Sequence, residues 1–229
     1  MNFWKKIFIT SLVILTGWIN LSPVALSLWQ WRDGVLFRAD WPSAASPVSG
    51  PDVLEPAIEL NDGKLMITSP SGQWESPENW IVQQAAWTDL NHDSRPEATL
   101  LVRRPFQPWP VDRVLPHGGR ISHHQDSDGM SSHIILIGWK KDHWGELWAG
   151  SALARPVRSF FAVDANEDGV QELITREGRY QDTDPSYAST LAVWQWNGFG
   201  FDLVSRVEKP SRWFTGLTDS EQNCLMLLQ

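Results

Sequence analysis

Short apolar runs separated by polar turn clusters make up most of the chain after residue 27. Clear examples are EATLLV, HIILIGW and TLAVWQW, at residues 97–102, 133–139 and 190–196. Their β-branched and aromatic side chains favour strands. No long segment repeats its apolar residues every 3.6 positions, as an amphipathic helix would. The pattern therefore predicts an all-β fold.

Two segments place a turn dipeptide between strand-like runs. They are WQWRDGVLF at residues 29–37 and WQWNGFGFDLV at residues 194–204. Asp-Gly and Asn-Gly favour tight hairpins, because both turn positions of such a hairpin need a positive φ. We therefore expect tryptophan-containing hairpins in both places.

Internal repetition indicates the architecture. Two Gln-Asp-Ser/Thr-Asp tetrads begin at Gln125 and Gln181, 56 residues apart, and similar strand-like runs follow each of them. Repeats of one supersecondary unit are typical of stacked sheets or propeller blades. One four-stranded unit is predicted at about residues 79–154 and a second at about 157–208.

The region before residue 79 holds two further hairpin patterns, SLWQWRDGVLFRA and AIELNDGKLMITS. We interpret them as a degenerate third unit. The prediction is then about three four-stranded antiparallel, propeller-like sheets within a domain at residues 28–229. Because closed propellers have at least about four blades, three sheets would form an open array or need a partner copy.

Each clear unit also contains an acidic loop in which oxygen-bearing side chains alternate. In the second unit the loop sequence is DANEDGVQE, and in the first it is DLNHDSRPE, 75 residues upstream. Three inward side chains, one backbone carbonyl and a following carboxylate resemble the oxygen ligand sets that Ca²⁺ takes. The candidate ligands are Asp164, Asn166, Asp168, Val170 through its carbonyl, and Glu172, then Asp89, Asn91, Asp93 and Glu97.

These residues carry a resemblance to a known family. The segments FFAVDANEDGVQELITREGRY and STLAVWQWNGFGFDLVSR are similar to the FG-GAP/VCBS repeat of integrin-type propellers and of many secreted bacterial proteins. The resemblance covers about residues 79–208 and implies a β-propeller fold and a calcium loop between two strands. The first unit departs from it, with Ser94 where glycine is usual and Pro96 just before Glu97.

An acidic loop also has a simpler interpretation. Asp and Asn side chains often bond to their own backbone in solvated turns. Calcium is the stronger prediction for the Asp164 loop, because Gly169 accepts positive φ without strain. It is weaker for the Asp89 loop, because Ser94 should resist that conformation.

The first unit is longer than the second by about 20 residues, which fall in residues 103–121. Long loops on rigid scaffolds often carry binding functions. The alternative is a loop that covers an open sheet edge.

The N-terminal segment has the character of an export signal. Lys5 and Lys6 precede an uncharged run that ends with small residues near Ala25 and Ser27. This pattern predicts a signal peptide at residues 1–27, with an uncleaved membrane anchor as the alternative. Export would place the protein in the periplasm, the cell envelope or outside the cell.

The composition of the chain excludes some classes of function. The formal net charge is −8, which argues against nucleic acid as a partner. The single cysteine excludes an internal disulfide. The favoured hypothesis is an exported, non-enzymatic calcium-binding module that serves protein interaction or adhesion. Two alternatives stay open: a carbohydrate- or wall-polysaccharide-binding protein that uses some of the 15 tryptophans, and an enzyme whose site no motif reveals.

Overall fold

The chain is an all-β protein in the part that the structure describes. The computed structural model describes residues 26–32, 35–39, 46–47, 56–107, 123–218 and 223–228. These residues form sixteen strands and no helix, which confirms the predicted fold class. Accordingly, no helix among them is long and apolar enough to cross a membrane.

Two four-stranded antiparallel meanders correspond to the two predicted units. The first contains β7 (Ile81–Thr88), β8 (Glu97–Pro105), β9 (Met130–Lys140) and β10 (His143–Ala149). The second contains β11 (Val157–Val163), β12 (Glu172–Glu177), β13 (Ala188–Trp196) and β14 (Phe201–Ser211). In each meander, consecutive strands pair in chain order.

The predicted third unit is not a single sheet, so the expectation of three sheets is wrong. Its second hairpin belongs to a three-stranded sheet of β4 (Ala57–Asn61), β5 (Lys64–Ser69) and β6 (Gly72–Glu75). Its first hairpin, β1 (Leu26–Arg32) with β2 (Val35–Arg38), joins a five-stranded terminal sheet. The other strands of that sheet are β3 (Ser46–Pro47), β15 (Trp213–Thr218) and β16 (Asn223–Leu228).

The terminal sheet brings the two ends of the described chain together. Strand β1 pairs antiparallel with β16, so that Leu26 lies opposite Leu228 and Trp29 opposite Leu225. Residues 1–25 of the predicted signal or anchor lie outside the described residues. Because β1 begins at Leu26, the predicted boundary after residue 27 falls within this strand.

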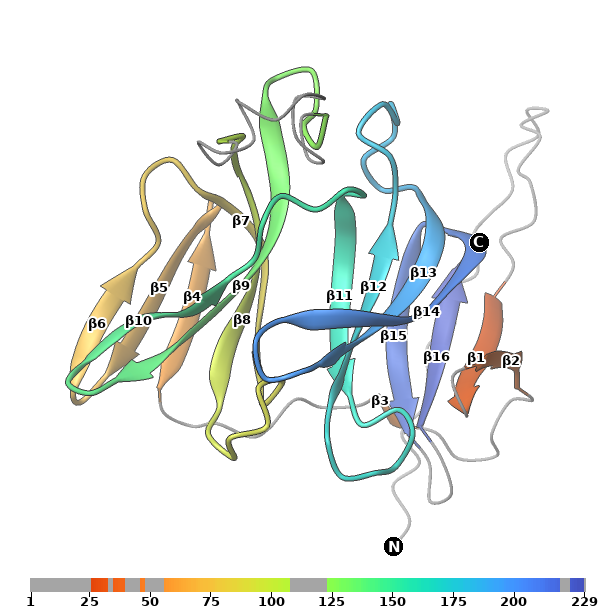
Figure 1. The fold of residues 1–229 in the computed structure, drawn as a ribbon, viewed down its shortest axis with the longest axis horizontal. Coiled ribbons are helices and arrows are strands. Elements are labelled where there is room, and N and C mark those ends of the chain that lie inside the picture. The colour runs from red at the N-terminus through yellow and green to blue at the C-terminus, as the bar shows by residue number, and fades with distance from the viewer. Residues whose placement is uncertain are drawn as a thin grey trace, which may run out of the picture.

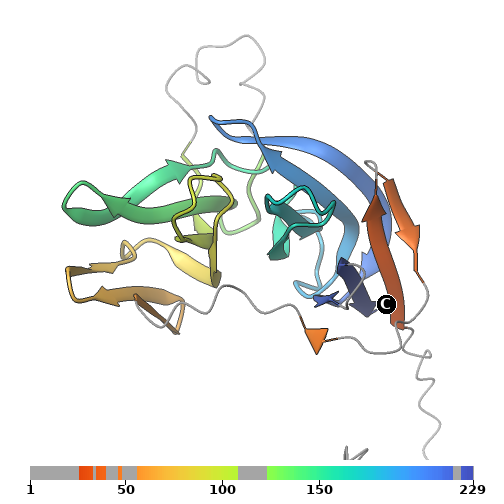
Figure 2. The ribbon, with the colours of Figure 1, turned by 90° about the horizontal axis from the view of Figure 1, so that it is seen from below.

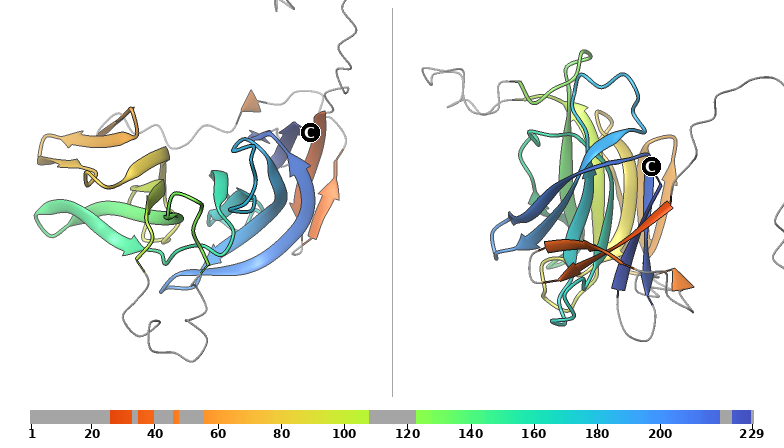
Figure 3. Two further views of the ribbon diagram at one scale, coloured as in Figure 1. Left: turned by 90° about the horizontal axis from the view of Figure 1, so that it is seen from above. Right: turned by 90° about the vertical axis from the view of Figure 1, so that its right-hand side faces the viewer.

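Three hydrophobic clusters join the four sheets in a row (Figures 1 and 3). The first lies between the β4–β6 and β7–β10 sheets and includes Ile67, Trp80 and Ile137. The second joins the β7–β10 sheet to the β11–β14 sheet through residues such as Leu101 and Phe160. The third joins the β11–β14 sheet to the terminal sheet. Figure 2 shows the resulting arc of sheets from below.

One hairpin turn has the expected positive φ at both positions of its dipeptide, and another does not. Asp62 and Gly63 both have positive φ, 47° and 77°, as a two-residue turn between β4 and β5 requires. Between β13 and β14, Gly198 has a φ of 92° but Asn197 is not among the positive-φ residues. The side chain of Asn197 instead accepts hydrogen bonds from the amides of Phe199 and Gly200, which widens the turn to four residues.

Candidate functional site

Both acidic loops connect the first two strands of a four-stranded sheet, β7 to β8 and β11 to β12. They lie at the lower ends of these strands in Figure 1. The four predicted side-chain ligands of one loop match those of the other at a constant offset of 75 residues. The structure therefore places the two predicted sites at equivalent positions of neighbouring sheets.

The Asp164 loop is folded around its own side chains. The carboxylate of Asp164 accepts hydrogen bonds from the amides of Asp168, at 3.0 Å, and Gly169, at 2.8 Å. Asn166 Oδ1 also accepts from the Asp168 amide, and Asp168 Oδ1 accepts from the Val170 amide at 2.9 Å. The bonds of Asn166 and Asp168 are the Asx turns of the simpler interpretation. Together with the longer-range bonds of Asp164, they fix the direction of each side chain.

The Asp89 loop repeats three of these bonds. Asp89 Oδ1 accepts from the amide of Ser94, Asn91 Oδ1 from Asp93, and Asp93 Oδ1 from Arg95, at 3.2, 3.1 and 2.9 Å. The equivalence holds although the sequence DSRP replaces DGVQ. The side-chain bonds, rather than the glycine, are thus the shared determinant of the loop.

Ser94 does adopt the conformation that it was expected to resist. Its φ is 62°, beside 91° for the equivalent Gly169. A residue with a side chain in this region carries strain of about 1–2 kcal/mol, which the three bonds of the loop offset. Ser94 therefore gives no reason to expect weaker calcium binding at the Asp89 loop than at the Asp164 loop.

A buried glutamate ends each loop at the first residue of the next strand. Glu97 is 1% exposed, and its Oε1 accepts from Thr88 Oγ1 at 2.8 Å and from the Leu90 amide at 2.7 Å. Glu172 is fully buried, and its Oε2 accepts from the Ala165 amide at 2.9 Å. The second oxygen of each carboxyl group is buried without a hydrogen-bond partner among the described residues.

Without a bound cation, both glutamates resist ionisation. Burial raises the pKa of Glu97 to about 7, and the charges of Asp89 and Asp93 add to this increase. Burial likewise raises the pKa of Glu172 to about 7, with Asp168 and Asp164 adding to it. An unpartnered buried oxygen is costly, and a cation would satisfy it and oppose the surrounding negative charge.

The two loops differ in how closely their acidic groups converge. One carboxylate oxygen from each of Asp89, Asp93 and Glu97 lies within 4.8 Å of the others. Among the residues that the structure describes, this is the one acidic, histidine or cysteine trio that meets this distance. In the Asp164 loop, the amide of Asn166 donates to Asp168 Oδ2 at 2.9 Å, which occupies one of the oxygens that a metal would use.

The loops also contact each other, which the sequence did not indicate. Gln171 precedes Glu172 in the second loop, and its Oε1 accepts a hydrogen bond from the Asp89 amide at 2.9 Å. The Gln171 carbonyl oxygen lies 3.1 Å from His92 Nε2. Residues about 80 positions apart meet here because β7 and β11 lie next to each other at the junction of two sheets. No sequence motif could have identified this contact.

The predicted binding insertion at 103–121 is described only at its start, residues 103–107. There, Arg103 near the end of β8 forms ion pairs with Asp126, at 2.8 Å, and Asp128, at 2.7 Å. These aspartates belong to the first of the repeated tetrads. The tetrad therefore anchors β8 to the loop before β9, in agreement with a structural role.

Comparison of the chain with protein-family models, curated proteins and solved structures gave no match. The resemblance to the FG-GAP/VCBS repeat accordingly depends on the quoted segments alone.

Proposed function

We propose that this protein is an exported, non-enzymatic calcium-binding β-repeat module that serves protein interaction or adhesion. The observation that carries the calcium proposal is the pair of buried carboxylate oxygens without partners, on Glu97 and Glu172. Each stands at the end of a loop whose other acidic side chains are already oriented by backbone bonds. A plain solvated turn would not bury a carboxyl group in this way.

The donor set suits calcium better than other common metals. The candidate ligands are all oxygens, which calcium and magnesium prefer over nitrogen or sulfur. Calcium tolerates irregular geometry, whereas magnesium demands a near-ideal octahedron. Asp89, Asp93 and Glu97 would hold an ion in the first loop, and Asp164, Asp168 and Glu172 in the second. A bound ion would supply positive charge to the buried carboxylates and cross-link the ends of two strands.

We also propose that the four sheets represent a partial or open β-propeller of the FG-GAP/VCBS type. Support comes from their packing in one row and from the pairing of β1 with β16, which brings strands from both ends of the chain into one sheet. Four sheets also reach the lowest blade number of known propellers.

Thermal and chemical unfolding of the full chain in EDTA and in millimolar calcium test the calcium proposal. Calcium should stabilise the native state by about 0.4 to 2 kcal/mol per site, the range for a weak extracellular-type site. Glu172→Gln should remove the contribution of its loop. At pH 8 in EDTA, the same variant should be about 1 to 3 kcal/mol more stable than the wild type, because a neutral amide replaces a buried carboxyl group whose pKa is raised to about 7.

Glu59→Gln is the matched control, because Glu59 is exposed on β4, away from both loops. It should unfold like the wild type under both conditions. Identical unfolding curves for the wild type in EDTA and calcium would show that both loops are plain acidic turns. A gain for Glu172→Gln that is equal in EDTA and in calcium would assign Glu172 a purely structural role.

Carbohydrate binding is a second candidate, favoured by an aromatic cavity of about 680 Å³ between the β7–β10 and β11–β14 sheets. Trp148, Trp194 and Phe201 line it, together with Phe199, whose side chain is 86% exposed. Aromatic faces with nearby polar groups such as Asn197 and Asp202 suit sugar rings. A glycan screen with the wild type and Phe199→Ala separates this candidate from a purely protein-binding role.

A further inference from the structure

A second cavity, of about 470 Å³, lies where the inner strands of three sheets meet. Its walls come from β7, from β11 and β12, and from the junction of β14 with β15. Among the described residues, the charged side chains that line it are all arginines: Arg158, Arg176 and Arg212. Such a lining is unexpected in a chain with a net charge of −8.

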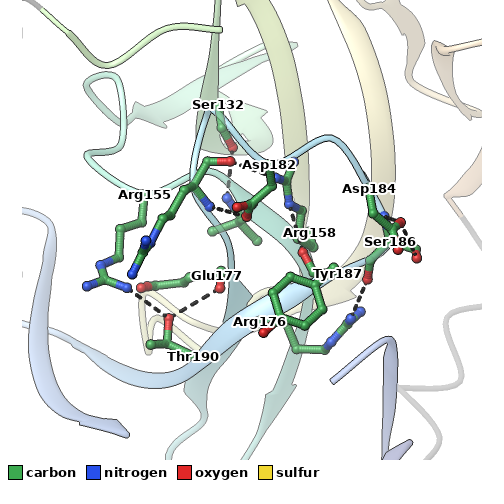
Figure 4. Close-up of polar contacts among 12 residues, drawn as sticks. Ser132, Arg155, Arg158, Arg176, Glu177, Asp182, Asp184, Ser186, Tyr187 and Thr190 are labelled. Atoms are coloured by element: carbon green, nitrogen blue, oxygen red, sulfur yellow. Dashed lines mark hydrogen bonds and ion pairs between the residues drawn. The ribbon is translucent and has the colours of Figure 1, made fainter. Parts of the chain in front are cut away.

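Arg176 is the most buried of the three, at 3% exposure. Its guanidinium donates to neutral groups: Ser211 Oγ and Ser159 Oγ, both at 3.1 Å, and the carbonyls of Ser186 and Ser211 at 2.7 and 2.6 Å. None of the ion pairs among the described residues includes it. The adjacent Glu177, by contrast, is paired with Arg206 at 2.9 Å. Figure 4 shows the contact between Arg176 and Ser186.

The other two arginines are held in place by side-chain and backbone oxygens. Arg158 donates from Nε to the Tyr187 carbonyl and from Nη2 to the Arg179 carbonyl at 2.9 Å. Its Nη2 also lies 3.5 Å from Asp182 Oδ2 (Figure 4). Arg212 bonds through Nη1 to Asp184 and to Ser186 Oγ. Neither aspartate lines the cavity. Within the described part of the chain, Nη1 of Arg158 and Nε and Nη2 of Arg212 make no hydrogen bond, which leaves them for a ligand.

The sequence makes room for this arrangement at Gly178. A Cβ atom there would lie 2.6 Å from Arg158 Nε and 2.9 Å from Asp182 Oδ2. Any larger residue would displace the guanidinium from its position beside Asp182. The glycine therefore helps to set the direction of Arg158.

The positive charge in the cavity is not fully balanced. Among the described residues, the three guanidinium groups have two aspartate partners, Asp182 and Asp184, and neither lines the cavity. Burial, together with the charge of Arg158, lowers the pKa of Arg176 to about 10. A buried cation beside a like charge is stabilised by an anion between them.

The remaining lining indicates what carries the anion. Phe161, Phe214 and the half-exposed Trp213 supply apolar walls, while Ser159 and Thr215 supply hydroxyl groups. Guanidinium forks match carboxylate and phosphate oxygens in geometry. We propose that this cavity binds a small molecule with a phosphate or carboxylate group on an aromatic or apolar body, with Arg158 and Arg212 as its direct contacts and Arg176 as a fixed charge behind them.

Calorimetric titration of the full chain with phenyl phosphate and with benzoate tests this proposal at constant ionic strength. We expect saturable binding of at least one of the two. The stronger of them identifies phosphate or carboxylate as the natural group. Benzylamine, which has an aromatic body but a positive charge, should bind at least tenfold more weakly.

Arg212→Gln should weaken binding of the preferred anion at least tenfold, and Arg212→Lys should weaken it less. Arg38→Gln is the matched control, because Arg38 is exposed on β2 and its loss changes the net charge equally. It should keep wild-type affinity within twofold. The proposal is overturned if the wild type binds neither anion, if benzylamine binds equally well, or if Arg212→Gln and Arg38→Gln give the same affinity. The wild-type titrations decide the matter even if a variant does not fold.

Discussion

His133 is a buried residue whose protonation should destabilise the fold. It is 5% exposed on β9, and its Nδ1 donates to the Gly150 carbonyl at 2.9 Å when the ring is neutral. Its Nε2 lies 2.7 Å from Ser131 Oγ, whose hydroxyl group can then donate to the ring. Burial, together with the nearby charge of Arg104, lowers the pKa of His133 to about 4.

This shift predicts a loss of stability in acid. Below about pH 6.5 the unfolded chain takes up a proton at this histidine and the folded chain does not, so the free energy of unfolding falls as the pH drops from about 6.5 to about 4. The full contribution is about 2 to 3 kcal/mol. Denaturant unfolding at a series of pH values should show a smaller slope for His133→Gln than for the wild type.

Other groups titrate in the same pH range. The informative quantity is therefore the difference in unfolding free energy between the wild type and His133→Gln. The raised pKa values of Glu97 and Glu172 act in the opposite direction, because these groups stay protonated in the folded state up to about pH 7. They are the same in both proteins and cancel in the comparison. Parallel stability curves would show that His133 keeps an ordinary pKa.

At the scale of elements, β15 packs unusually closely against β11. A Cβ atom at Gly216 would lie 2.2 Å from the ring of Phe161, which itself packs edge-on against Phe214. Glycine therefore allows the terminal sheet to approach its neighbour, and a side chain there would push the two sheets apart.

Gly216→Ala should destabilise the protein by about 1 to 3 kcal/mol, as overpacking of a core does. Gly145→Ala on β10 is the matched control, because its Cβ would meet its nearest neighbours at an ordinary 3.5 Å. That substitution should be neutral or slightly stabilising, since glycine weakens a strand. The two free energies of unfolding come from denaturant titrations, and equal values would contradict the close approach.

The apolar runs were sufficient to predict the strands of the two complete sheets but not all of the sheet partners. EATLLV and TLAVWQW became β8 and β13, since a buried strand needs a continuous apolar run. The hairpin at 29–37 was also recognised, but its pairing with β16 depends on residues almost 200 positions away. Local patterns hold no information about such contacts, and this is why one predicted unit turned out to belong to two sheets.

The candidate sites likewise differ in how far they could be predicted from local sequence. The spacing of the acidic residues identified the loops, because every side chain that shapes them lies within nine positions. The arginine cavity was not predicted, because Arg158, Arg176 and Arg212 come from three strand ends. The burial of one oxygen on Glu97 and on Glu172 depends on the packing of whole sheets, which the motif cannot reveal.

At the scale of the whole molecule, opposite charges lie at opposite ends of one hairpin. The pairing of β11 with β12 places Val163 and Glu172 at the end with the acidic loop, and Val157 with Glu177 at the other. Arg158 and Arg176 lie near that second end. The proposed cation and anion sites therefore lie at opposite ends of this hairpin, where they would not compete for the same surface.

The hydrogen bond between the two acidic loops predicts that a change in one loop alters calcium affinity at the other. Because Gln171 Oε1 accepts from the Asp89 amide, a change in one loop should alter the other through this bond. A single hydrogen bond contributes about 0.5 to 1.5 kcal/mol, so the coupling should change calcium affinity by about two- to tenfold. In calorimetric calcium titrations, Asp89→Ala should weaken binding at the Asp164 loop by such a factor. In a Gln171→Ala background, the same substitution should leave that loop nearly unaffected. Gln73→Ala, an exposed change on β6, should preserve the coupling. If Asp89→Ala has the same effect with and without Gln171, the two loops bind independently, and the junction between their sheets transmits nothing through this side chain.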